Sequence, residues 1–282
     1  MEDVFSPEST RLMSLILIPG LLGWTAVFWH SRGLKTRLRN GSNWLIWRPL
    51  PFGLLPAVFL AILLGLLAQF ALVSMLGALV KAPLPTVIMH LIAILTFHAP
   101  AAVMAMAWFQ QSRIPLAQGL GLETGRGGGE LAAGISGYLL AFPAVVIAGA
   151  LTLFVFNRFG FEMSLQPTVL DLKQIQHPME WLLVFLLVVL IGPFCEEILF
   201  RGVLFPWLSQ RLGLIAGLLL HSLIFAAVHG HAASAFPLFI LSLFLGILYL
   251  LRQNLLAACW MHAVFNGISL LNVFLAARGG EF

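Results

Sequence analysis

Charged residues are scarce in this sequence. Asp, Glu, Lys and Arg make up only 9% of its 282 residues, and 60% of the residues are hydrophobic, whereas charged residues are about 25% of an ordinary soluble domain. The mean hydropathy is +0.99. This composition excludes a typical soluble protein and predicts an all-α, polytopic transmembrane helical bundle in a lipid bilayer. The net charge of +4 comes without a basic, aromatic-rich surface, so no nucleic-acid partner is expected.

The sequence also has few cysteines and lacks the features of a cleavable signal peptide. The two cysteines, Cys195 and Cys259, lie in apolar segments. Two are too few for a disulfide framework, so we interpret both as packing residues. The acidic N-terminus lacks the basic region of a cleavable signal peptide, so the first span is expected to stay in the protein.

Long apolar runs make up most of the sequence. A bilayer crossing needs about 20 mostly apolar residues, and reading for that length predicts eight spans. They lie near residues 11–30, 52–79, 85–109, 131–156, 180–208, 212–230, 234–252 and 255–277.

The basic residues predict an orientation. The loop at 32–48 carries the densest basic run, namely Arg32, Lys35, Arg37, Arg39 and Arg48. The positive-inside rule places this loop in the cytoplasm and the N-terminus outside.

Ionisable residues divide the chain into two parts. The first four spans, within 1–178, contain few beyond His90 and His98. The last four spans, within 179–282, contain two glutamates, an arginine and several histidines. We therefore expect the chemistry of the protein to lie in 179–282.

Two adjacent glutamates lie within the fifth apolar run. Charged side chains inside a membrane are costly, usually pair, and mark a site. Glu197 and Arg201 are one helical turn apart and can pair, and burial makes that pairing close to obligatory. Glu196 is rotated by about 100° on the helix and is predicted to face a cavity. Gly192 and Pro193 precede the pair and predict either a break that loosens the helix or a simple packing kink.

Two later spans carry histidines with partners on the same helix face. Phe225 and His229 are one turn apart, as are His262 and Asn266. An imidazole with an amide one turn away can orient water or an oxyanion. A single membrane histidine more often only bonds to a neighbouring helix, but here two histidines accompany Asn266 and Glu196.

Two chemistries fit this set. In one, Glu196 is a general base for water, a histidine assists, and His262 with Asn266 stabilises an oxyanion. In the other, Glu196, His229 and His262 bind a zinc-like divalent metal ion that activates water. The usual zinc-protease signature is absent, as is a Gly-x-Ser-x-Gly serine motif. The cofactor is therefore either none or a divalent metal.

The three patterns together resemble a known family. In order they are Glu196-Glu197-x-x-x-Arg201, Phe225-x-x-x-His229 and His262-x-x-x-Asn266. They resemble the motifs of the CAAX protease and bacteriocin-processing (CPBP, Abi) family of intramembrane endopeptidases. The resemblance covers about 190–270.

The resemblance implies hydrolysis of a peptide bond near the C-terminus or a processing site of a protein or peptide, which can be lipidated or membrane-tethered. It implies that Glu196 activates water with help from His229, and that His262 and Asn266 hold the oxyanion or complete the water site. Glu197 and Arg201 would be the supporting pair. The resemblance makes 179–282 the catalytic core, and because the spans within 1–178 match none of its motifs, we expect them to select the substrate. The alternative is a transporter or channel with a Glu/His proton relay, which predicts polar residues throughout the bundle and inverted repeats. Neither is evident.

Overall fold

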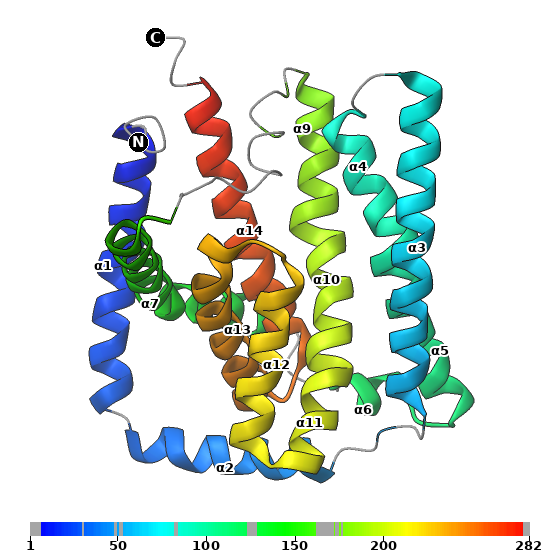
Figure 1. Ribbon diagram of the computed structural model, residues 1–282. Coiled ribbons are helices and arrows are strands. Elements are labelled where there is room, and N and C mark those ends of the chain that lie inside the picture. Colours follow the sequence, from blue (N-terminus) through cyan, green and yellow to red (C-terminus); the bar gives the residue numbers. More distant parts are fainter. Residues whose placement is uncertain are drawn as a thin grey trace.

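In the computed structural model (Figure 1), the described part of the chain consists of helices joined by short turns and contains no strand. It describes residues 7–29, 31–47, 50, 53–81, 84–122, 129–161, 172, 175 and 177–278. The acidic first residues of the N-terminus lie outside these ranges. The predicted all-α fold is confirmed.

Six helical segments are long and apolar enough to cross a membrane. They are α3 (Leu54–Val80), the run of α4 (Thr86–Ala93), η2 (Ile94–His98) and α5 (Ala99–Gln111), α7 (Glu130–Phe159), the long helix Pro178–Leu212, α13 (Ala232–Arg252) and α14 (Leu255–Arg278). Two shorter apolar helices occupy the remaining predicted spans, one within α1 (Pro7–Trp29) and the other forming α12 (Leu214–Val228). Each of the eight predicted spans thus coincides with a helical segment.

The predicted loop at 32–48 is mostly a helix, α2 (Ser31–Trp47). It runs along the bottom of Figure 1, below α1 and α11 (Phe205–Leu212). A Cβ atom on Gly41 would overlap the carbonyl oxygen of Leu250, so glycine allows α2 to pack directly on the backbone of α13. Gln210 also donates a hydrogen bond to the carbonyl of Leu45 at 3.4 Å. These tertiary contacts explain why the basic segment is folded, and its membrane side stays a prediction.

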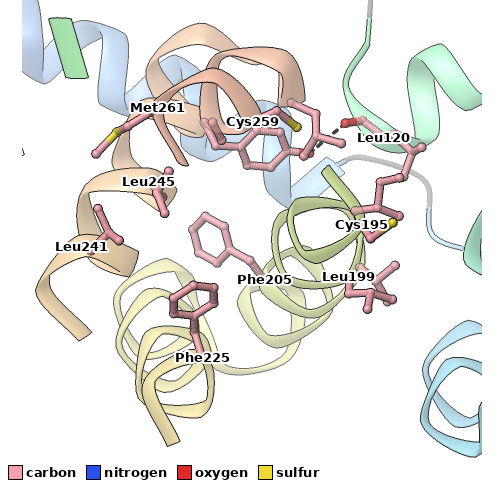
Figure 2. Packing of buried hydrophobic residues seen from close by; sticks show 14 of the residues in the cluster. Leu120, Cys195, Leu199, Phe205, Phe225, Leu241, Leu245, Cys259 and Met261 are labelled. Atoms are coloured by element: carbon pink, nitrogen blue, oxygen red, sulfur yellow. Dashed lines mark hydrogen bonds between the residues drawn. The ribbon is translucent and has the colours of Figure 1, made fainter. Parts of the chain in front are cut away.

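The hydrophobic core joins the two parts of the chain. One buried cluster takes residues from α1, α2, α3, α5 and α7 as well as from the last four spans. Phe205 and Phe225 extend into the interior beside Leu241 and Leu245 of α13 (Figure 2). All four are buried, and inside a bilayer such packing stabilises the bundle through van der Waals contacts between the helices. A substrate-selecting role for 1–178 stays a prediction.

The long helix 178–212 switches from the α-helical to the π-helical hydrogen-bond pattern twice. It begins with α9 (Pro178–Val184), and α10 (Gly192–Glu197) lies between two π-helical segments, η4 (Phe185–Ile191) and η5 (Ile198–Leu204). Instead of a break at Gly192 and Pro193, the helix continues, and the amide of Gly192 bonds to the carbonyl of Leu187 in the wider π pattern. Single π turns within α-helices are rare and occur frequently at functional sites.

Candidate active site

Glu197 and Arg201 form a fully buried ion pair. Arg201 Nη1 donates to Glu197 Oε1 at 2.7 Å, and both side chains are 0% exposed. The pairing predicted from their spacing is therefore confirmed. A charge buried this deeply is tolerated only when it is paired and hydrogen-bonded.

The same arginine connects three helices. Arg201 Nη2 donates to Ser242 Oγ of α13 at 2.8 Å and to the Ser242 carbonyl at 3.3 Å. Its guanidinium carbon lies 4.7 Å from the centre of the Phe225 ring of α12. The planar guanidinium has several donors in fixed directions, so one side chain ties η5 to α12 and α13. Ser242 was not predicted, because a lone serine in an apolar span has no spacing signal.

His262 shares the carboxylate oxygen that Arg201 uses. Its Nδ1 lies 2.8 Å from Glu197 Oε1, and because a carboxylate oxygen accepts, Nδ1 carries the hydrogen. The ring is 3% exposed, and its Nε2 faces Glu196 Oε2 at 3.9 Å. Glu197 therefore does more than pair with Arg201, since it also sets the orientation of His262.

His229 follows the last residue of α12 and is fixed by its own helix. Its Nδ1 donates to the carbonyl of Phe225 at 2.7 Å. The Phe225 ring centre lies 4.8 Å from that of His229 and 5.8 Å from that of His262. A single aromatic ring thus contacts both predicted catalytic histidines, and Arg201 as well. The three sequence motifs meet around it.

Asn266 binds a backbone carbonyl in the neighbouring helix. Its Nδ2 donates to the carbonyl of Val188 in η4 at 2.8 Å. Gly192, which directly follows η4, bonds to Leu187 in the π pattern, and in that pattern the donor to the Val188 carbonyl would be Pro193, which has no N–H. Asn266 thus satisfies an acceptor that proline leaves without a backbone donor, and it keeps one amide hydrogen for another partner.

Glu196 lies where the first half of the chain meets the second. Its side chain is 19% exposed, and its Oε1 is 3.4 Å from Nε2 of His98, which is also 19% exposed. Its Oε2 is buried and has no hydrogen-bond partner among the described residues. The contact with His98 was not predicted, because the only available signal was a histidine in an otherwise apolar span.

A metal ion in a protein is held by several His, Cys, Asp or Glu side chains that converge on one point. In the described part of the chain, no group of three or more His, Cys, Asp and Glu side chains could hold one. As arranged, Glu196, His229 and His262 do not form such a group. The zinc-like ion stays an untested prediction.

The comparison with protein families agrees with the motifs. The family described as "Type II CAAX prenyl endopeptidase Rce1-like" matches residues 178–268, about a third of the 282 residues. This segment runs from α9 into α14 and contains Glu196, Glu197, Arg201, His229, His262 and Asn266. Neither the curated proteins nor the solved structures provide a match. The family resemblance is thereby confirmed for the segment that carries all three motifs, which is similar to the Rce1-like branch of the CAAX protease and bacteriocin-processing family.

Proposed function

We propose that this protein is an intramembrane endopeptidase in which Glu196 activates water. The substrate is a protein or peptide at the membrane, cleaved near its C-terminus or at a processing site. The observation that carries the proposal is the surroundings of Glu196: a buried carboxylate oxygen without a hydrogen-bond partner among the described residues faces Nε2 of His262. The family match over 178–268 supports a peptidase reaction.

The first step adds water to the scissile carbonyl. Glu196 Oε2 accepts a proton as the water oxygen bonds to the carbonyl carbon. His229 assists, because the hydrogen on its Nδ1 is committed to Phe225 and its Nε2 can accept a hydrogen bond from the same water. The electron pair of the carbonyl bond moves onto its oxygen, which becomes the oxyanion.

The oxyanion needs donors. Asn266 contributes the amide hydrogen that Val188 does not use, and His262 donates from Nε2 when both ring nitrogens carry protons. Glu197 keeps the His262 ring directed at the site. In the second step the carbon–nitrogen bond breaks, the amine takes the proton from Glu196, and a free acid and a free amine leave.

Variants of the proposed catalytic residues test this function. The purified protein is incubated with a prenylated CAAX-type peptide, the substrate class that the family's name suggests, and cleavage is followed by mass spectrometry. We expect Glu196→Gln, His229→Ala and His262→Ala to lose activity by about 10²- to 10⁴-fold, the usual contribution of a general acid or base. Glu180→Gln, the same chemical change in the first turn of α9, is the control. Full activity in all three variants would refute the proposal.

A chelator separates the two chemistries that the sequence left open. If Glu196 and His229 activate water without a metal ion, dialysis against a chelator leaves the cleavage rate unchanged. Stoichiometric zinc in the purified protein, lost together with activity and restored by added zinc, would replace this mechanism with the metal-dependent one.

A further inference from the structure

We infer that His98 is a positioning residue for Glu196, supplied by the first half of the chain. The inference rests on the proposed function of Glu196. His98 ends the π-helical segment η2 and lies outside the matched segment 178–268. Its Nε2 is 3.4 Å from Glu196 Oε1, so it contacts the proposed catalytic carboxylate on the oxygen opposite to the one that faces His262.

The orientation of the His98 ring follows from its other contact. Nδ1 lies 3.2 Å from the carbonyl oxygen of Ala93. A carbonyl oxygen only accepts, so Nδ1 carries a hydrogen in this contact. Nε2 is then directed at Glu196, and when it is also protonated the ring donates at both ends. Bound in this way, Oε1 is occupied and Oε2 is left to receive the proton of the attacking water.

Close backbone packing holds η2 in place. A Cβ atom on Gly65 of α3 would overlap the carbonyl oxygen of Thr96, so glycine lets α3 approach the backbone of η2. On the other side, a Cβ atom on Gly192 would lie 3.7 Å from the side chain of Ile94, which places η2 against the start of α10. His98 is therefore attached to a segment that two helices fix.

The groups around Glu196 come from several elements. His98 approaches from η2 and His262 from α14, while His229 and Arg201 are close enough to interact with its charge. Of these four, only His98 precedes residue 178. Through His98, the first half of the chain contributes to the proposed catalytic centre. Loss of His98 should then lower kcat and leave KM nearly unchanged.

Two amide variants separate positioning from a purely structural role. The amide nitrogen of glutamine can occupy the place of Nε2 and still donate to Glu196. The amide nitrogen of asparagine occupies the place of Nδ1 and reaches only Ala93. We expect His98→Gln to keep kcat within a few-fold of the wild type. His98→Asn and His98→Ala should lower kcat by about 10²-fold, the effect of a misplacement of about 1 Å in a reacting group.

Thermal denaturation of a separate sample of each purified variant first shows how much of it is folded. Cleavage rates are then expressed per folded molecule. His90→Gln, on the same transmembrane segment, serves as the control, and Glu196→Gln is assayed in parallel. Wild-type kcat in every His98 variant, beside an inactive Glu196→Gln, overturns only this inference. Rescue by asparagine and not by glutamine also overturns it, because it shows that His98 only binds Ala93. An active Glu196→Gln overturns the proposed function and this inference together.

Discussion

Glu196→Gln and Glu197→Gln make the same chemical change at neighbouring positions, and the structure predicts opposite outcomes. Glu197 is 0% exposed, and its Oε1 accepts from Arg201 at 2.7 Å and from His262 at 2.8 Å. A neutral amide in its place removes the counter-charge to which the buried guanidinium of Arg201 is hydrogen-bonded. Breaking a buried pair in this way costs about 3–5 kcal/mol, a large share of the roughly 5–15 kcal/mol that keeps a typical protein folded.

Glu196 differs from Glu197 in both its burial and its partners. Its side chain is 19% exposed, and its nearest partners are histidines at 3.4 and 3.9 Å. Glutamine has nearly the same shape and can keep a contact with His98. We therefore expect Glu196→Gln to change the free energy of unfolding by less than about 1 kcal/mol. Cleavage should fall by about 10²- to 10⁴-fold, because an amide cannot accept the proton of water.

The assay compares abundance in membranes, thermal denaturation in detergent and cleavage for both variants. Glu197→Gln should be scarce and denature at a lower temperature, and Glu196→Gln should be abundant, folded and inactive. Wild-type stability of Glu197→Gln would mean that Arg201 has another counter-charge, and the account of the buried network would be wrong. Normal activity of Glu196→Gln would refute the general-base role.

Two further predictions concern the packing around the site. Gly65→Ala should lower cleavage and stability, because its Cβ would overlap the backbone of η2, whereas Gly77→Ala on the same helix has open space around it and should behave as wild type; equal effects on cleavage would contradict the packing argument. Asn266→Ala should destabilise the protein by about 1–3 kcal/mol, because the Val188 carbonyl loses its donor. Adding Pro193→Ala restores a backbone N–H and should recover part of that loss in thermal denaturation, so strict additivity of the two changes would refute the assignment.

The sequence was sufficient to locate the apolar spans and to pair Glu197 with Arg201. Apolar length is a local property, so each span could be located without knowledge of its neighbours, and the helical segments agree within a few residues. Glu197 and Arg201 were paired because they are one turn apart and because an unpaired guanidinium in hydrocarbon is too costly. Both predictions depend on interactions within one helix.

Contacts between different helices could not be predicted from spacing within one helix. Nothing in the spacing of His98 relates it to Glu196, because that contact depends on how η2 packs against α10 and α3. The π-helical segments have no residue pattern of their own that could predict them. Helix α2 was predicted as a loop because its basic residues indicated a segment outside the membrane. Its contact with α13 depends on Gly41, whose role cannot be recognised from the sequence. For η2 and for α2, a glycine (Gly65 and Gly41, respectively) allows a close approach to a segment far away in the sequence.

The predicted division of labour between the glutamates requires one change. Glu197 was expected to be purely structural, but a single atom, Oε1, serves both Arg201 and His262. In the proposed mechanism, stability and chemistry therefore depend on the same carboxylate oxygen. It follows that Glu197→Gln should lower kcat even when the rate is expressed per folded molecule, since His262 loses the acceptor that orients its ring. Arg201 donates to the same carboxylate oxygen and lies close enough to Glu196 for the two charges to interact, so its loss should lower kcat through both glutamates.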